Sequence, residues 1–210
     1  MKRFWMALLI LLFLSLFIRF DGRGIDQNLN DGSKLEVRSD YEVGQTFISG
    51  HDNLYKVEVS IVSLVKTEGQ EVIFHLRDGV SSDADILKKT VDAYNIENCT
   101  YYGFDFEPIK NSKSKRYYFF LESSNLAQGN IIYACYNTND VYPDGSVHIN
   151  QKPLNGDLQF RTYYKTRFID ILNNYFSSLF QDWSFFIFYF SLLAISIFLL
   201  ITLIKSKSRF

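Results

Sequence analysis

The hydrophobic positions of this chain follow three different patterns. Residues 4–18 and 185–204 are apolar runs without a charged residue. Between about residues 34 and 164, short stretches alternate apolar and polar side chains, and from 167 to 183 apolar residues recur every three or four positions. Uninterrupted apolar runs, alternation and a three-to-four period indicate a membrane helix, a β-strand and an amphipathic helix, respectively. The pattern therefore predicts a β domain between two apolar segments.

The alternating stretches predict an antiparallel β-sheet protein. Val57, Val59 and Ile61, for example, alternate with polar residues, and Val72–Leu76 repeats the pattern. Clusters of Gly, Asn, Asp and Ser separate these runs, which favours a jelly-roll β-sandwich over βαβ units. The stretch Asp83–Tyr94 fits either a short helix or a strand with long loops. Further predicted strands are Lys34–Arg38, Gly44–Ile48, Tyr101–Phe106, Arg116–Glu122, Asn130–Tyr136, Ser146–Asn150 and Asp157–Tyr164.

The second apolar run has the length of a transmembrane helix. Its twenty uncharged residues reach about 30 Å as a helix, which matches the hydrocarbon thickness of a bilayer. Trp183 precedes the run, and three basic residues follow it, Lys205, Lys207 and Arg209. By the positive-inside rule this arrangement places the C-terminus in the cytoplasm.

The first apolar run follows Lys2 and Arg3 and fits either a cleavable signal peptide or a retained signal anchor. No Ala-x-Ala cleavage pattern follows it, which favours the anchor. We therefore expect a two-pass protein of the cell membrane with both termini cytoplasmic and the β domain extracytoplasmic. The expected parts are an anchor at 1–23, a β-sandwich at 24–165, a stem helix at 166–183, a transmembrane helix at 184–204 and a basic tail at 205–210.

Charge is distributed in agreement with this topology. All 23 acidic residues lie between Asp21 and Asp182, whereas six of the 22 basic residues lie outside that stretch. The stretch thus holds 16 basic and 23 acidic residues, a net charge of −7, and the ends carry +6. A strongly basic nucleic-acid binder is excluded. The expected partners are the lipid bilayer, a cell-surface glycan and another integral membrane protein.

The predicted stem helix has one apolar face. Such a face fits contact with the membrane surface or with its own domain, and it also fits docking to another membrane protein. The stripe consists of Phe168, Leu172, Tyr175, Phe176, Leu179 and Trp183.

Two cysteines occur, Cys99 and Cys135, and both fall in the segment expected outside the cytoplasm. In that compartment they can form a disulfide; in a reducing niche they remain two free thiols.

The sequence contains no motif typical of an enzyme. Metal-ligand spacings, a phosphate-binding glycine loop and a nucleophile elbow are absent, and the three histidines are far apart. Asp83-Ala84-Asp85 has the form used by sugar-nucleotide transferases, but no nucleotide-binding βαβ pattern surrounds it. We expect a protein without enzymatic activity or cofactor.

Candidate ligand contacts come from tyrosines and one loop. Strand alternation directs one member of each pair Tyr101-Tyr102, Tyr117-Tyr118 and Tyr163-Tyr164 away from the core side, where an aromatic ring suits the apolar face of a sugar. Packing beneath loops or against a neighbouring chain is the alternative. The loop around Pro143 carries three further candidates for a calcium or sugar site. The candidate residues are Tyr101, Tyr117, Asp140, Tyr142 and Asp144.

Several strand motifs resemble a known family. The motifs are GQTF at 44–47, VIFHLR at 72–77, FDFEPI at 104–109, YYFFLE at 117–122 and GDLQFRTYY at 156–164. Together they resemble the lectin-like, galactose-binding-type jelly-roll domains of prokaryotic membrane proteins associated with surface-polysaccharide and glycosyltransferase machinery. The resemblance implies a carbohydrate-binding or accessory module in cell-envelope glycan or glycolipid assembly or export. The alternative function is a structural subunit that docks into a larger membrane complex and has no ligand of its own.

Overall fold

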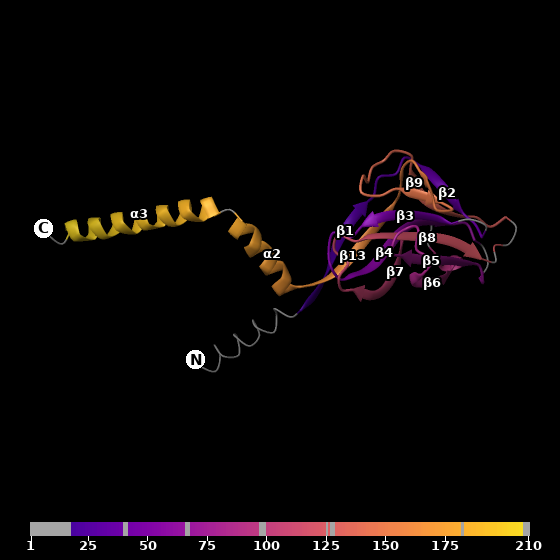
Figure 1. Ribbon diagram of the computed structural model, residues 1–210, viewed down its shortest axis with the longest axis horizontal. Helices are drawn as coiled ribbons and strands as arrows, with labels where there is room; N and C mark the ends of the chain where they lie inside the picture. Colours follow the sequence, from indigo (N-terminus) through magenta and orange to yellow (C-terminus); the bar gives the residue numbers. More distant parts are fainter. Residues whose placement is uncertain are drawn as a thin grey trace, which may run out of the picture. The chain divides into compact units, whose positions relative to one another are not determined.

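The computed structural model describes residues 18–39, 42–65, 68–96, 100–124, 126, 129–181 and 183–207 (Figure 1). Contacts divide the chain into two compact units. One is a β domain, Phe20–Thr166, and the other contains the helices α2 (Phe168–Gln181) and α3 (Trp183–Lys207). The expected anchor at residues 1–17 lies outside the described residues.

The described part of the β domain forms two antiparallel sheets, as predicted, which makes the protein mainly β. In sheet A, β4 (Leu54–Ser63) pairs with β7 (Thr100–Ile109) on one side and with β13 (Phe160–Arg167) and β9 (Ile132–Asn137) on the other. The remaining strands of sheet A are β1 (Arg19–Gln27) beside β13, and β2 (Ser33–Val37) and β12 (Asp157–Leu158) beside β9.

Sheet B has the order β11-β10-β3-β8-β5-β6. Its strands are β3 (Val43–Ile48), β5 (Glu71–Arg77), β6 (Asp85–Asp92), β8 (Arg116–Ser124), β10 (Val147–Ile149) and β11 (Lys152–Leu154). Figure 1 shows β6 at the margin of the domain, next to β5.

One aromatic core joins the two sheets. Phe74 of sheet B stacks on Phe104 of sheet A with 4.3 Å between the ring centroids, and Phe47 and Phe160 are 5.9 Å apart. All four side chains are fully buried. Because these residues occupy alternate positions of their strands, the alternation that predicted the strands also generates the core.

Most strand predictions are confirmed, and the differences lie at the margins. The ambiguous stretch from Asp83 is β6 followed by a 3-10 turn, Ala93–Asn95. The strands β1 and β11 were not expected. β1 begins at Arg19, inside the stretch assigned to the anchor, and its sequence RFDGRGIDQ does not alternate, so only pairing with β13 reveals it as a strand.

The helix α2 forms where the three-to-four periodicity predicts it. Four of its described apolar residues are exposed, Phe168 at 38%, Ile171 at 45%, Tyr175 at 62% and Phe176 at 51%, while Ile169 and Leu172 are half-buried. The side chains of Leu179 and Trp183, the other two residues of the predicted stripe, lie outside the described part.

In α3 the described side chains are those of residues 186–198, and the large apolar ones from Ile187 to Phe198 are exposed. Among the described residues, no helix combines the length and the mean hydropathy of a membrane span.

Candidate functional site

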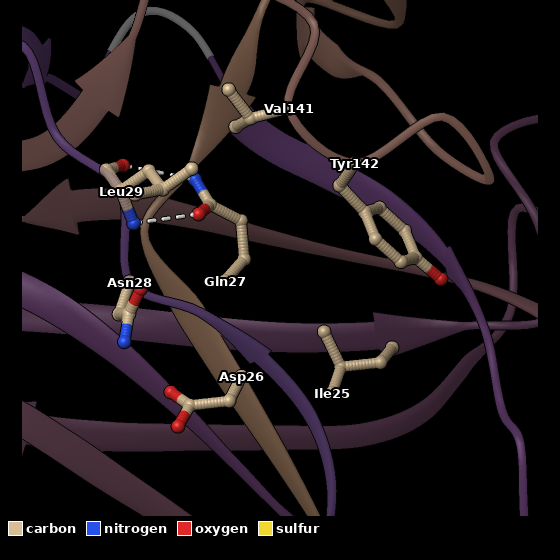
Figure 2. A pocket seen from close by; sticks show the side chains of 7 residues that line it. All are labelled: Ile25, Asp26, Gln27, Asn28, Leu29, Val141 and Tyr142. Atoms are coloured by element: carbon tan, nitrogen blue, oxygen red, sulfur yellow. Dashed lines mark hydrogen bonds between the residues drawn. The ribbon is translucent and has the colours of Figure 1, made fainter.

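A pocket opens where β1 ends and continues into the next segment (Figure 2). Its volume is about 400 Å³, and it is lined by Ile25, Asp26, Gln27, Asn28, Leu29, Val141 and Tyr142. The first five are consecutive residues, and the last two belong to the loop that connects β9 to β10. The pocket therefore lies between an N-terminal strand and a loop that is more than a hundred residues further along the chain.

Gln27 shapes the pocket from within. Its amide nitrogen donates to the carbonyl oxygens of Leu29, at 3.1 Å, and Leu158, at 3.3 Å, while its amide oxygen accepts from the N–H of Leu29 at 2.8 Å. Both groups of this buried amide are engaged, so Gln27 fixes the path of the chain after β1. The side chains available for contact with a ligand are therefore those of the other residues that line the pocket.

The loop wall is held by a fully buried carboxylate, Asp157 on β12. Its Oδ2 accepts from the backbone N–H groups of Val141, at 2.8 Å, and Tyr142, at 2.9 Å, and its Oδ1 accepts from the side chain of Gln45 at 2.8 Å. Gln45 lies on β3, and its amide oxygen accepts from the N–H of Leu158. Buried charges persist when hydrogen bonds satisfy them, and this one ties the loop to both sheets.

Tyr142 is fixed as firmly as its backbone. The hydroxyl accepts from the N–H of Ile48 at 3.2 Å, and the ring meets Phe160 edge-on at 5.6 Å. Burial raises the pKa of Tyr142, so the phenol stays neutral at physiological pH. Tyr142 thus presents a rigid aromatic wall to the pocket.

Asp26 and Asn28 also line the pocket, and Figure 2 shows the carboxylate of Asp26 directed away from Ile25 and from the ring of Tyr142. Asp26 accepts from Arg161 Nε at 2.6 Å and from Arg23 at 2.7 Å. Burial acts to raise the pKa of Asp26, but the hydrogen bonds from Arg161 and Arg23 outweigh it and hold the pKa below its usual value. Asp26 is therefore a fixed, ionised acceptor, and Asn28 is exposed.

Tyr101 borders this site on the outer side of sheet A. The guanidinium of Arg161 lies 3.7 Å from the centroid of its ring, and its hydroxyl donates to the carbonyl oxygen of Gln27 at 3.4 Å. Arg161 thus covers a face of the Tyr101 ring, which was predicted to contact a sugar. Tyr101 orients Arg161 and hence Asp26.

The other predicted contacts are dispersed. Tyr117 is 2% exposed and packs against Phe47 in the core. Asp140 and Asp144 are exposed on the same loop as Tyr142. Within the described ranges, no group of three or more His, Cys, Asp or Glu side chains has an arrangement that could hold a metal ion. Of the five predicted ligand residues, Tyr101 and Tyr142 meet around Gln27.

Cys135 is buried on β9, and Cys99 lies outside the described residues, so the predicted disulfide stays a prediction.

Asp26, Asn28 and Arg161 were not among the predicted site residues. Nothing in the sequence of β1 predicted a strand that would place Asp26 and Asn28, and Arg161 joins the site only through its hydrogen bond to Asp26. One signal for the site was nevertheless present. Gln45 falls between Val43 and Phe47 at a position that alternation assigns to the core, and a polar residue there implies a buried hydrogen-bond partner. Asp157 is that partner.

Comparison of the sequence with protein-family models and with curated proteins gives no match. Functional arguments therefore rest on the site itself.

Proposed function

We propose that this chain is a membrane-anchored, extracytoplasmic binding module of the jelly-roll class that recognises neutral carbohydrate, as an accessory to cell-envelope glycan or glycolipid assembly or export. The observation that carries the proposal is the pocket, whose lining combines the ring of Tyr142 and the aliphatic side chains of Ile25, Leu29 and Val141 with the polar residues Asp26 and Asn28. Pockets with apolar walls and a few convergent polar groups are typical of small-molecule sites.

The chemistry of the pocket suits a sugar ring. An ionised carboxylate has about four lone-pair sites, and the arginines use two of those on Asp26, so it can still accept from hydroxyl groups. Asn28 offers both a donor and an acceptor. The apolar side chains of Leu29 and Val141, with the ring of Tyr142, suit the C–H face of a pyranose.

Binding is favoured over catalysis by the state of Asp26. Two arginines hold its pKa down. A general acid or base works best with a pKa near the operating pH. The pKa of Asp26 is instead lowered, away from that range. A permanently ionised carboxylate recognises hydroxyl groups without exchanging protons.

The proposed anchoring rests on the apolar runs and on α3. The sequence from Phe185 to Ile204 carries no charge, and the described apolar side chains of α3 point outward from a helix. Two of its hydroxyl groups bond within the helix, from Ser191 to the carbonyl of Ile187 and from Ser196 to that of Leu192, so neither needs water as a partner.

The two proposed membrane segments adjoin neighbouring strands in the sequence. The first precedes β1 and the second follows β13 by way of α2; β1 and β13 are neighbours in sheet A, and the N–H of Phe168 donates to the carbonyl of Ile18 at 3.3 Å.

The test is carbohydrate binding by the full chain in nanodiscs, first on an array of neutral hexose-containing oligosaccharides and then by titration calorimetry with the strongest binder. Asn28→Ala removes one direct contact, and we expect the Kd to rise by about fivefold, the value of one hydrogen bond. Tyr94→Ala, a substitution of an exposed tyrosine outside the pocket, is the control and leaves the Kd unchanged. An array without binders, or equal effects of both variants, contradicts the proposal.

A second candidate function is a structural subunit of a membrane complex, and the exposed apolar residues of α2 favour it. Crosslinking in native membranes, followed by gentle detergent extraction, distinguishes the two. A stable assembly with another membrane protein that forms through α2, together with an empty glycan array, supports the subunit.

A further inference from the structure

On the side of sheet B that faces away from the core, His75 lies between two carboxylates. Its Nδ1 is 2.7 Å from Asp85 Oδ2, and its Nε2 is 3.1 Å from Glu122 Oε1. The three residues belong to three adjacent strands, β6, β5 and β8, and His75 is 4% exposed. We call Asp85, His75 and Glu122 the histidine clamp.

The clamp needs two protons on the imidazole. Carboxylates are ionised near neutral pH and then only accept hydrogen bonds. Both contacts of His75 are therefore hydrogen bonds only while both ring nitrogens carry a proton. A neutral imidazole has a single N–H, so it leaves a lone pair facing one of the two carboxylates.

The surrounding groups favour a fixed geometry. Phe120 stacks on the imidazole at 4.3 Å and is 1% exposed. The guanidinium of Arg77 lies over the ring of Phe120, 4.6 Å from its centroid, and Arg77 also donates to Asp85 Oδ1 at 2.6 Å. Burial acts to raise the pKa of Asp85, but hydrogen bonds from Arg77 and His75 hold it below its usual value, so this acceptor stays ionised.

Other titratable groups lie close to the clamp. Glu42, which precedes β3, is 3.9 Å from Arg77, and Lys88 lies opposite His75 in the register of β6 and is exposed. Tyr118 stacks on Phe120, and His148 on β10 meets the ring of Tyr118 at 5.6 Å. Burial raises the pKa of Tyr118 and lowers that of His148, so both are neutral at physiological pH. Among the charged groups, the acceptors that His75 meets are Asp85 and Glu122.

The strand that the clamp holds is the last one in sheet B. β6 follows β5 at the end of the strand order, and its residue Ile86 is 46% exposed. Asp85 is its first residue, so the clamp acts where β6 begins. Edge strands are the parts of a sheet that open most readily by local unfolding, because only one neighbour supplies a ladder of hydrogen bonds.

We propose that the histidine clamp is a proton-operated latch, which ties the start of β6 to sheet B while His75 carries both protons and loosens it as the pH rises. The sign follows from the donors: the second proton adds the second N–H, so the stabilisation is present while both ring nitrogens carry a proton and is lost when one proton leaves. This latch is independent of the proposed carbohydrate site, which lies on β1 and the loop after β9.

The test is amide hydrogen exchange of the full chain in nanodiscs at pH 5.5 and pH 8.5, corrected for intrinsic exchange. For the wild type we expect the protection of the β6 amides near Asp85 to fall by roughly tenfold to a hundredfold at the higher pH, the value of one charge-assisted hydrogen bond. Amides of β4 in sheet A serve as the internal control and keep their protection. Unchanged protection of β6, or an equal loss in β4, overturns the proposal.

Glu122→Gln provides the decisive variant. A glutamine amide can accept from the imidazolium or donate to the neutral ring, so both forms of His75 remain satisfied. We expect the pH dependence of β6 protection to vanish while the strand stays protected at both pH values. A wild-type-like fall in Glu122→Gln overturns the latch. His75→Gln, which does not titrate, must also abolish the pH dependence.

Discussion

The outer faces of the two sheets accommodate their outward-pointing tyrosines in opposite ways. On sheet A, Lys56 pairs with Glu58 at 2.9 Å, and Tyr163 donates to the same carboxylate at 2.7 Å, next to solvent. On sheet B, Tyr118 and Phe120 are buried under polar side chains, although no second sheet covers them. Among the described residues, the hydroxyl of Tyr118 and Oε2 of Glu42 are the buried side-chain atoms without a hydrogen-bond partner.

The contrast shows why a tyrosine pair does not by itself predict a binding platform. Alternation does place Tyr163 and Tyr118 on outer faces. On sheet A the ring is covered by cations, with Lys56 4.8 Å and Arg23 5.8 Å from the centroid of Tyr163. On sheet B the ring is enclosed. An outward direction on a strand therefore differs from exposure to a ligand.

Substitution of glycine by alanine should give the largest difference in stability between the two outer faces. At Gly44 on sheet B, a Cβ atom would lie 2.4 Å from the carbonyl oxygen of Phe119 and 2.6 Å from the ring of Tyr118. We expect Gly44→Ala to lower the free energy of unfolding by about 3 kcal/mol, the upper end of ordinary overpacking. Urea unfolding of the full chain, followed by near-UV circular dichroism, measures it.

Gly103 on sheet A is the matched control. A Cβ atom there would meet its nearest neighbours on Lys56 and Glu58 at ordinary contact distances from 3.5 Å. Gly103→Ala should be neutral or stabilising by about 0.5 kcal/mol, because alanine reduces the freedom of the unfolded chain. Similar destabilisation by both substitutions would remove the distinction between the faces.

Removal of a tyrosine hydroxyl should have opposite signs on the two faces. Tyr163→Phe deletes the hydrogen bond to Glu58 and should cost about 1 kcal/mol. Tyr118→Phe deletes a buried hydroxyl that has no partner and should stabilise the fold by about 1 kcal/mol. The same unfolding assay gives both values; a loss of stability in Tyr118→Phe would show that its hydroxyl has a partner, such as an ordered water.

Acid should lower the stabilising contribution of Asp26 on sheet A, and this is the smallest of the expected effects. The pKa of Asp26 is lowered in the folded state, so this carboxylate stabilises the protein above its unfolded pKa, and the contribution is lost as the pH falls through the folded value. Asp26→Asn should cost at most about 1 kcal/mol at pH 7 and less at pH 2. Unfolding midpoints at both pH values test this, and an equal cost at pH 2 would mean that the substitution acts through packing.

Hydrophobic periodicity predicted strands and α2 well, because both depend on which side chains of a segment must leave water. It assigned the stretch from Asp83 ambiguously, since β6 is an edge strand without a buried side chain and its sequence DILKKTVD does not alternate apolar and polar residues. It did not predict β1, because charged residues and glycines interrupt the alternation of apolar and polar residues there. The site could not be predicted for the same reason: Asp26 and Asn28 approach Tyr142 only after β1 has paired with β13.

The sequence by itself determined most of the sheet-forming segments and the apolar runs, because each depends on the pattern within a few residues, and it gave the uneven distribution of charge directly. Only the tertiary structure decided that Tyr117 belongs to the core, that Arg161 covers Tyr101, and that His75 lies between Asp85 and Glu122. These contacts join residues from different strands. The physical reason is that strand order and register set which side chains meet, and register is selected by the packing of the whole domain.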